Sequence, residues 1–332
     1  MSIARASFTN ILFPKIGRRY FSNDLEKIGF VGLGSMGSKM VQNLSKEGKS
    51  ILVYDISSSA VKNVTGINVQ GGTIDQIANE CRTVISILPN DDILNSVANA
   101  LLEKSRFPNF THISCSTVSP STSRALAVKH EGFKKKFISA PVFARPDGIA
   151  RKQAVWMISG NSAGRELAAS LLSGGGSVVD YGDDAGAANV VKLCGNFLIA
   201  SSIEAIAEAM AFAEKNGVDR VQVMKLLSST IFDCLIFKGY GQRVSERDHR
   251  AGGFSLNLGL KDVTLVSKAA REAEVPMPIL SALLDRYTSA KARGRGELDW
   301  SAIGLSAAED AGIDISQDLE RNLKALEEGN TY

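Results

Sequence analysis

Lys27-Ile-Gly-Phe-Val-Gly-Leu-Gly-Ser-Met-Gly37 is the stretch that decides the fold of this chain. It runs from an apolar segment, residues 28–31, through the pattern G-x-G-x-x-G into an amphipathic segment. In a dinucleotide-binding βαβ unit, Gly32 permits the tight turn, Gly34 lets the backbone approach a pyrophosphate, and Gly37 lets the helix lie close to the strand. The stretch therefore predicts a strand, a nucleotide-binding turn and a helix.

Backbone N–H groups at the start of this helix are expected to hold the phosphates, because a helix N-terminus carries free donors and a positive dipole end. The helix is predicted to begin near Ser35. The expected cofactor contacts are Gly32, Leu33, Gly34, Ser35, Met36 and Gly37. The alternative is a glycine turn in an α/β domain that binds no nucleotide.

An acidic residue, Asp55, closes the next apolar run, 23 residues after Gly32. A carboxylate there accepts hydrogen bonds from both ribose hydroxyls of an adenosine and repels a 2′-phosphate. NAD is therefore favoured over NADP. Lys62 lies one or two helical turns further on and can partly compensate a phosphate, so NADP stays the less favoured alternative.

Short apolar runs alternate with helical patterns as far as residue 182, which predicts a doubly wound parallel sheet of the Rossmann type. The expected strands after the first are residues 51–54, 83–88, 111–114, 137–140 and 155–159. Ligands bind at the carboxyl ends of such strands. We therefore expect the loops at residues 89–92 and 114–120 to border the cofactor.

After the glycines at 174–176 and the pair Asp183-Asp184, the pattern becomes almost entirely helical. The first helix is expected at residues 185–216 and measures ~45 Å at 1.5 Å per residue. Further helices are predicted at residues 219–229, 260–273, 279–293, 299–305 and 318–328. The predicted division is a leader at 1–22, a Rossmann domain at 23–184 and an all-helical substrate and oligomerisation domain at 185–332. Because the long helix is apolar around most of its circumference, we expect a homodimer or homotetramer.

The first 22 residues contain four basic side chains and no acidic one, with apolar residues spaced to form one face of a helix. This composition is typical of a mitochondrial transit peptide, and Arg18-Arg19-Tyr20-Phe21-Ser22 resembles a processing site. The mitochondrial matrix is the expected location. The alternative is a disordered basic tail on a cytoplasmic enzyme.

Charge and composition exclude several classes of protein. Without the four basic residues of the leader, 34 basic side chains face 35 acidic ones, which removes the main support for nucleic-acid binding. The longest uninterrupted apolar stretches fall far short of the ~20 residues of a membrane span. Four scattered cysteines and three histidines, with no C-x-x-C, predict neither a metal site nor a disulfide framework.

Lys192 is the strongest catalytic candidate. It lies early in the long helix among small and apolar neighbours, where desolvation lowers a lysine pKa toward neutrality and makes the amine a proton acceptor. Asn189 and Asn196, at i−3 and i+4, share its face. The alternative is a lysine whose stem packs while its ammonium reaches solvent.

Five motifs, in order between residues 27 and 305, resemble those of the β-hydroxyacid dehydrogenase family, which includes 3-hydroxyisobutyrate dehydrogenase. They are Gly29-Phe-Val-Gly-Leu-Gly-Ser-Met-Gly37, Ser116-Thr-Val-Ser-Pro120, Ala140-Pro-Val142, Lys192 with Asn196, and Gly259-Leu-Lys-Asp262. The resemblance implies a Rossmann domain followed by a helical domain, with the active site between them.

The resemblance also implies roles for individual residues. Lys192 matches the general acid/base and Asn196 the residue that orients substrate. The resemblance places Thr117, Leu88, Pro89 and Lys261 near the cofactor. Lys261 and Asp262 are expected to close over the site from the helical domain. Ser116, Asn189, Asp262 and Phe254 are expected around the substrate. A helix-start ion pair is the alternative for Lys261 and Asp262.

One loop departs from the family pattern. The family usually has Ala-Pro-Val-Ser-Gly-Gly, which binds the substrate carboxylate, whereas this chain continues from Val142 with Phe143-Ala144-Arg145-Pro146. Phe143 removes a hydroxyl donor and narrows the pocket, and Arg145 can clamp a carboxylate, sulfonate or phosphate. Our hypothesis is that Arg145 replaces the lost donors or binds a second anionic group. The alternative is an exposed loop arginine.

The sequence therefore predicts NAD-dependent oxidation of a short, anionic β-hydroxyacid to its semialdehyde or ketoacid. One alternative is reduction of a small aldehyde or imine with NADH or NADPH. The other is a nucleotide-binding protein that has lost catalysis.

Overall fold

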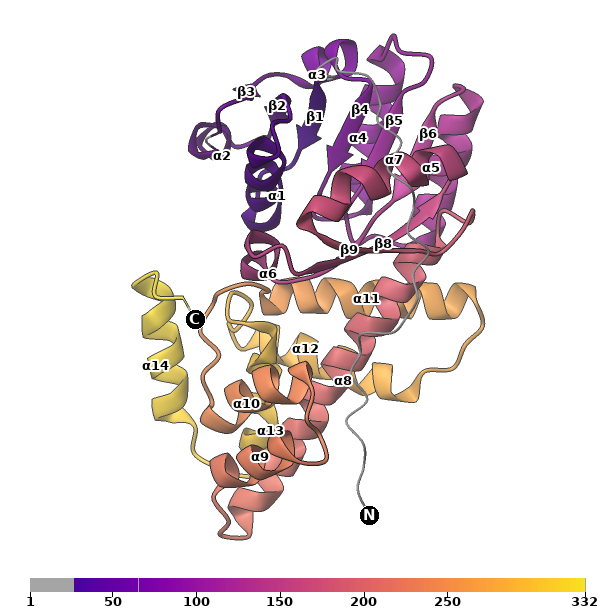
Figure 1. Ribbon diagram of the computed structural model, residues 1–332. Coiled ribbons are helices and arrows are strands. Elements are labelled where there is room, and N and C mark those ends of the chain that lie inside the picture. The colour runs from indigo at the N-terminus through magenta and orange to yellow at the C-terminus, as the bar shows by residue number, and fades with distance from the viewer. Residues whose placement is uncertain (1–26, 65, 332) are drawn as a thin grey trace.

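Two halves of different construction make up the protein, a sheet flanked by helices and a bundle of helices (Figure 1). The computed structural model describes residues 27–64 and 66–331. The predicted transit segment, residues 1–22, lies outside the described residues. The predicted fold class, a Rossmann domain followed by an all-helical domain, is confirmed.

Within residues 27–64 and 66–331 the sheet has nine strands, and its first six are parallel in the order β3-β2-β1-β4-β5-β6. Beyond β6 the sheet continues with β8, which is antiparallel to β6, pairs with β7 on one side and runs parallel to β9. The strands are β1 Ile28–Val31, β2 Ile51–Tyr54, β3 Val69–Gly71, β4 Thr83–Ser86, β5 Thr111–Ser114, β6 Lys136–Ser139, β7 Val142–Phe143, β8 Ala154–Gly160 and β9 Gly176–Asp180.

Helices cover both faces of the sheet. They are α1 Ser35–Lys46, α2 Ser58–Asn63, α3 Ile74–Glu80, α4 Asp91–Lys104, α5 Pro120–Gly132, α6 Pro146–Ala150 and α7 Ser162–Leu172, with a 3₁₀ turn, η1, at Ser173–Gly175. The predicted start of α1 at Ser35 is confirmed. The strand order reverses between β1 and β4, so the loops at the carboxyl ends of β1, β4 and β5 are the ones expected to bind a ligand.

Three strands were missed by the sequence analysis. Strands β3 and β7 have three and two residues, too few to show an alternating pattern. Strand β9 begins at Gly176, inside the glycine run that was interpreted as a boundary. Conversely, β4 ends at Ser86, two residues before the predicted end, since the chain turns there into the loop facing the glycine turn.

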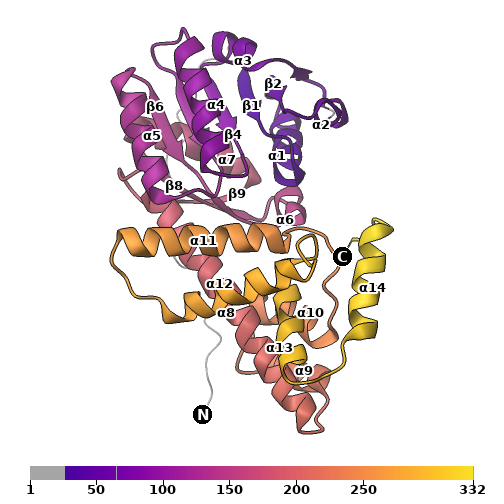
Figure 2. The same cartoon turned by 180° about the vertical axis from the view of Figure 1, so that it is seen from behind.

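The second half is helical and is built around α8 Ala187–Lys215, which extends from the sheet down through the bundle (Figure 1). Figure 2 shows α11 lying directly beneath the sheet domain, with α12 below it. The other elements are α9 Arg220–Ser229, the π-helical turn η2 Phe237–Gly241, α10 Gln242–Glu246, α11 Leu256–Glu272, α12 Pro278–Ala292, η3 Trp300–Ile303, α13 Gly304–Asp310 and α14 Ser316–Glu327.

Two helix predictions in this half need correction. Helix α11 begins at Leu256, about one turn before the predicted residue 260, because the Ser255 hydroxyl caps it by accepting from Leu258 N–H. The segment predicted as one helix at 299–305 is a 3₁₀ turn that leads into α13. The turn at Phe237–Gly241 and helix α10 were not predicted at all.

Helix α8 is long and apolar enough to cross a membrane by length and composition alone. It contains no uninterrupted apolar stretch of that length, because polar residues are scattered along it. Within the protein it packs against α11 and α13, and its buried side carries Lys192 and Glu204. A buried core helix passes the same test of length and composition. In the structure α8 is the central helix of the helical bundle.

Candidate functional site

The glycine turn has the geometry that its sequence predicts. Gly32 has a φ of +97°, and a Cβ there would lie 2.2 Å from the Ile87 carbonyl oxygen. A Cβ on Gly37 would lie 2.0 Å from the Gly32 carbonyl oxygen. By contrast, a Cβ on Gly34 would meet no atom within 4 Å. Two glycines thus serve the fold, and the third leaves open space at the helix N-terminus, as a pyrophosphate requires.

Asp55 lies directly beside this turn. One carboxylate oxygen accepts a hydrogen bond from Leu33 N–H at 2.7 Å, and the other accepts from Ser57 N–H at 2.8 Å. These bonds fix the carboxylate at the end of β2, next to the helix start, where the ribose of an adenosine is expected. The residues at this end therefore fit a dinucleotide.

The loops after β4 and β5 are joined to one another. Ser116 is buried, and its hydroxyl accepts a hydrogen bond from Leu88 N–H at 2.8 Å. Thr117 lies next to it and is half-buried, and Pro89 is exposed. Ser116 thus holds the Leu88 loop in place, while its predicted contact with substrate stays a prediction.

Lys192 lies on α8 and is only 9% exposed, so the alternative of a side chain reaching into solvent is wrong. Its Nζ lies 4.6 Å from the centre of the Phe143 ring. Burial lowers the pKa of the Lys192 ammonium to about 8, with Asp262 raising it and Lys261 lowering it. The amine can therefore gain and lose a proton near neutral pH.

Asn196 lies one turn beyond Lys192 and is also buried. Its side-chain nitrogen donates a hydrogen bond to Asp262 Oδ2, and Asp262 Oδ1 lies 2.9 Å from Lys261 Nζ. Lys261 in turn donates to the Thr117 carbonyl oxygen at 2.9 Å, across the boundary between the two halves. The ion pair of the alternative interpretation is therefore present, but its carboxylate is buried and its ammonium spans the two halves, so it is neither at the surface nor at the start of α11.

Asn189 completes the predicted face of α8 but is engaged by the protein. Its side-chain oxygen accepts from Val118 N–H at 3.4 Å, and its nitrogen donates to the Ser123 hydroxyl at 2.9 Å. These bonds tie α8 to the loop after β5. A contact between Asn189 and substrate stays a prediction.

Arg145 is not the exposed loop arginine of the alternative interpretation. Its guanidinium crosses to the helical half, where it donates to Tyr240 Oη at 3.4 Å and to Asp299 Oδ2 at 3.3 Å. Burial opposes the charged form of Arg145, but Asp299 and Tyr240 outweigh it and raise the pKa of the guanidinium. A Cβ on Gly253 would meet this guanidinium at 2.8 Å, so the 253 loop lies against it.

Aromatic residues continue the wall next to Arg145. The Phe254 and Trp300 rings meet edge to face with centres 4.7 Å apart, and Tyr240 meets Trp300 at 5.6 Å. Tyr240 and the buried carboxylate of Asp299 were missed by the sequence analysis. Tyr240 lies in a π-helical turn, and no residue pattern marks such a turn in a single sequence.

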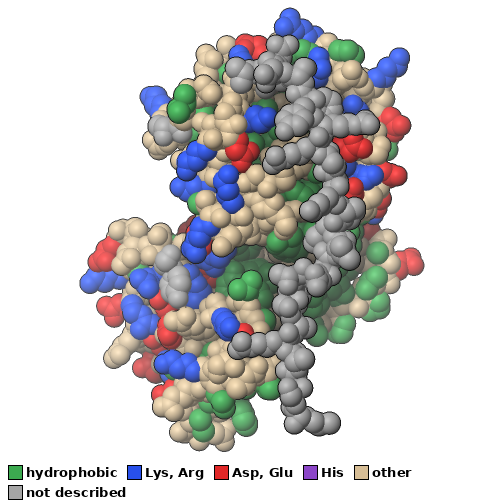
Figure 3. All heavy atoms as spheres, viewed as in Figure 1, with side chains coloured by type: hydrophobic (Ala, Val, Ile, Leu, Met, Phe, Trp, Pro, Cys, Tyr) green, Lys and Arg blue, Asp and Glu red, His purple; other side chains and the backbone are tan. Residues whose placement is uncertain are grey.

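Several cationic groups lie where the two halves meet. Lys261 pairs with Asp262, Arg145 pairs with Asp299, and the Lys192 amine lies near Asp262 and Lys261. Figure 3 shows a hollow between the halves with Lys and Arg side chains at its rim. Cationic groups gathered in this way favour a small anion in this region.

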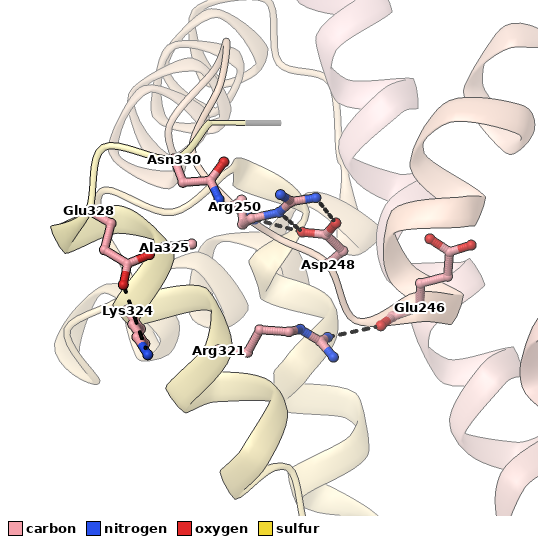
Figure 4. A pocket seen from close by; sticks show the side chains of 8 residues that line it. All are labelled: Glu246, Asp248, Arg250, Arg321, Lys324, Ala325, Glu328 and Asn330. Carbon is pink, nitrogen blue, oxygen red and sulfur yellow. Dashed lines mark hydrogen bonds and ion pairs between the residues drawn. The ribbon is translucent and has the colours of Figure 1, made fainter.

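A second hollow, of about 580 Å³, lies in the helical half beside α14 (Figure 4). It is lined by Glu246, Asp248, Arg250, Arg321, Lys324, Ala325, Glu328 and Asn330. The Arg250 guanidinium pairs with Asp248 at 2.6 Å, and Arg321 donates to the Glu246 carbonyl at 3.1 Å. Its charges are satisfied within the protein, and none of the predicted site residues line it.

Within the part of the chain that the structure describes, no group of three His, Cys, Asp or Glu side chains is placed to hold a metal ion. Cys115, beside the loop after β5, is buried, and burial raises the pKa of its thiol. It packs in the core of the sheet half, as expected of a small buried residue.

Known proteins match both halves of this arrangement. Residues 27–182 match the NAD binding domain of 6-phosphogluconate dehydrogenase, and residues 186–306 match the NAD-binding family of NADP-dependent 3-hydroxyisobutyrate dehydrogenase. An uncharacterised oxidoreductase of Bacillus subtilis, YfjR, is 30% identical over 83% of this chain and 98% of its own length. The chain belongs to the β-hydroxyacid dehydrogenase family.

Further family members agree with this assignment. The mitochondrial 3-hydroxyisobutyrate dehydrogenase of Drosophila melanogaster is 29% identical over 84% of this chain and 88% of its own length. The structure of Mycobacterium tuberculosis 3-hydroxyisobutyrate dehydrogenase with L-serine has a TM-score of 0.76 at 25% identity, and covers 85% of this chain and 98% of that one. This β-hydroxyacid dehydrogenase is an NAD(P)-binding oxidoreductase of the class that acts on CH–OH groups.

Proposed function

We propose that the enzyme catalyses the NAD-dependent oxidation of a short-chain β-hydroxyacid to its semialdehyde or ketoacid. The observation that carries this proposal is the buried Lys192 amine, one helical turn from Asn196 and in contact with Phe143 of the nucleotide-binding half. The names of the relatives point to the same substrate class.

NAD is preferred over NADP in this proposal. The backbone at residues 32–37 would hold the pyrophosphate, and Asp55 would accept the ribose hydroxyls and repel a 2′-phosphate. The nicotinamide supplies the hydride acceptor. Against this preference, one of the matching families is described as NADP-dependent.

Lys192 Nζ is the proposed base that takes the hydroxyl proton during oxidation and returns it to the carbonyl oxygen during reduction. Asn196, held by Asp262, would donate to the same oxygen through its amide. The surrounding ammonium and guanidinium groups would bind the substrate carboxylate. Oxygen and carboxylate would thereby be fixed relative to the base before the proton moves.

Turnover of a panel of short hydroxyacids and semialdehydes with NAD and NADP tests the reaction. In the Lys192→Ala variant we expect kcat to fall by about 10²- to 10⁴-fold, the usual contribution of general acid–base catalysis. Cofactor affinity, measured by fluorescence titration, should stay unchanged. Lys291→Ala, on the exposed side of α12, is the matched control. Loss of cofactor binding together with activity would instead make Lys192 a structural residue.

The pH dependence follows from the lowered pKa of Lys192. Oxidation needs the neutral amine, so kcat for oxidation should rise as pH increases through about 8. Reduction needs the ammonium, so kcat for reduction should fall over the same range. Parallel profiles in the two directions would contradict the assignment of Lys192 as the acid/base.

Arg145 is proposed to bind the substrate carboxylate or a second anionic group. Its bonds to Tyr240 and Asp299, at 3.3 to 3.4 Å, are long for charge-assisted hydrogen bonds, so an incoming anion can compete for the guanidinium. Arg145→Ala should raise KM for acidic substrates by about 10- to 100-fold. Arg151→Ala, an exposed arginine paired with Asp147, should not. An unchanged KM for every acidic substrate in Arg145→Ala would contradict this role.

Phe143 favours a second candidate, the reduction of a small aldehyde or imine. It places an aromatic ring where the family usually has a hydroxyl donor, and thereby makes the pocket less polar. Initial rates of hydroxyacid oxidation and of aldehyde and imine reduction, each with both cofactors, distinguish the two reactions. Faster turnover of neutral aldehydes or imines would favour the second.

A homodimer or homotetramer is proposed from the exposed apolar side chains of the helical half. These are Leu198 and Phe212 on α8, and Ile231 and Leu235 after α9, each more than 60% exposed. An apolar surface of this kind is normally covered by another subunit. Light scattering after size-exclusion chromatography measures the mass, and a monomer at micromolar concentration would contradict the proposal.

Residues 1–22 are proposed to direct the protein to the mitochondrial matrix. The Drosophila relative named above is called mitochondrial. N-terminal sequencing of the protein isolated from its own cells should find a start near residue 21 or 22. An intact first residue in a cytoplasmic fraction would support the alternative location.

A further inference from the structure

The Phe143 ring packs against α8 at Gly195, where the absence of a Cβ atom leaves room for it. A Cβ on Gly195 would lie 2.3 Å from Cζ and 2.6 Å from Cε1 of the Phe143 ring. Real Cβ atoms do not approach other atoms this closely, so any other residue at position 195 would displace the ring. The ring is therefore seated on the helix at Gly195, next to Lys192.

The backbone of strand β7 directs the ring to this place. Val142 points into the core of the sheet half, and Phe143, the next residue, points to the opposite side. Strand β7 is anchored by pairing with β8, where Phe143 lies opposite Val155. The ring thus comes from a paired strand, which restricts its movement.

We propose that Phe143 and Gly195 form a fitted pair that covers the Lys192 amine and directs it toward Asn196. Phe143 is in this view a positioning residue, and the inference rests on the proposed catalytic role of Lys192. The face of the ring meets the amine at 4.6 Å from the ring centre, within the range of a cation–π contact, while its edge rests on the helix backbone.

The Phe143 ring affects the pKa of the Lys192 amine in two opposing ways. The ring keeps water from the amine, which disfavours the ammonium, whereas its π-face attracts the ammonium. The charged groups that act on Lys192 besides the ring are Asp262 and Lys261, both from α11, and they oppose each other. Burial is the largest cause of the lowered pKa of Lys192. We therefore expect water exclusion by the ring to outweigh its attraction for the ammonium.

Two substitutions at position 143 separate these effects. Phe143→Ala removes both the cover and the π-face, so the pKa of Lys192 should rise by about one unit or more toward its usual value. Phe143→Leu keeps an apolar cover without a π-face, so the pKa should fall by about half a unit. Opposite shifts are expected only if the ring both covers and attracts the amine.

Gly195→Ala tests the fit without changing Phe143. The added methyl group should push the ring aside and raise the pKa of Lys192 as Phe143→Ala does. In the double variant the methyl group enters the space left by the ring, so the two shifts should not add. Thermal unfolding of each variant identifies any that fail to fold, and Phe143→Leu remains as the least disruptive one.

The measurement is the pH dependence of Lys192 acetylation by acetic anhydride in the full chain, followed by mass spectrometry, with exposed Lys291 as internal reference. It requires neither substrate nor turnover. An unchanged Lys192 pKa in Phe143→Ala and Gly195→Ala would overturn the proposal. Shifts in acetylation without matching shifts in the pH profile of turnover would support the pair but contradict the catalytic role of Lys192.

Discussion

The two ends of the site differ in how they are assembled. The turn and helix start at the cofactor end come from ten consecutive residues, 28–37, with Asp55 close behind in the chain. The proposed substrate end brings together Phe143, Lys192 and Asp262, each from a separate element. The first end depends on local backbone geometry, whereas the second depends on how two halves of the chain pack. Substitutions should therefore affect the two ends through different measurements.

The largest effect is expected at the cofactor end from Gly37→Ala. Its methyl group would lie 2.0 Å from the Gly32 carbonyl oxygen, a backbone atom that cannot move without breaking the turn. We expect loss of cofactor binding and a strongly lowered Tm. In the matched variant Gly34→Ala, the methyl group enters open space, so Tm should stay the same while cofactor affinity falls. Equal effects of both variants on Tm would contradict the division of roles between these glycines.

At the proposed substrate end, Asp262→Asn should lower kcat by about 10- to 100-fold, because the charge-assisted hydrogen bond that holds Asn196 is lost. The substitution weakens the anchor of Asn196 and removes the carboxylate that raises the pKa of Lys192. The midpoint of the oxidative pH profile should move below about 8. Asp285→Asn, exposed on α12, provides the control. A midpoint that stays in place would show that Asp262 does not act on Lys192.

Lys261 contacts both ends of the site, so its substitution tests whether the two ends act independently. Its ammonium reaches from α11 to the Thr117 carbonyl oxygen in the sheet half. Lys261→Met should raise the Kd of the cofactor by about tenfold, because one charge-assisted hydrogen bond across the boundary is lost. Titration with NAD measures it, with Lys291→Met as control. An effect on kcat alone would assign Lys261 to the substrate end.

The smallest effect concerns acid stability, to which both halves contribute. His130 is buried, and burial lowers its pKa to about 4, while its usual value is 6.5. The unfolded chain therefore binds a proton between pH 6.5 and 4 that the folded chain does not bind, and stability should fall as pH falls through this range. Thermal unfolding at pH 7.5 and 5 measures the loss, and His130→Gln should reduce it. A Tm independent of pH in this range would contradict a neutral buried His130.

Much of the fold was readable from sequence because its signals are local. The strand, glycine turn and helix at 28–46 form one continuous pattern, and the main helices α8, α9 and α12 were predicted within a few residues. Strand β7 and the π-helical turn at Phe237–Gly241 were missed, because both are short and are held by their neighbours rather than by their own residue preferences.

Part of the candidate site could likewise be predicted from the sequence, and part could not. The face of α8 that carries Lys192 and Asn196 follows from helix periodicity, and its burial agrees with the expectation. The partners of Arg145 do not follow from any pattern, since Tyr240 and Asp299 lie 95 and 154 residues further along the chain. The sequence alone is also compatible with Arg145 in an exposed loop, and its contacts with the helical half decide against that position.

The sequence by itself determined that this chain binds a dinucleotide and carries a lysine suited to proton transfer, because spacing along a strand or helix fixes which side chains share a face. Only the tertiary structure decided that Phe143 sits on Gly195 over that lysine and that Arg145 faces Asp299. These contacts depend on the packing of two halves against each other, where shape and desolvation act between residues that no local periodicity relates.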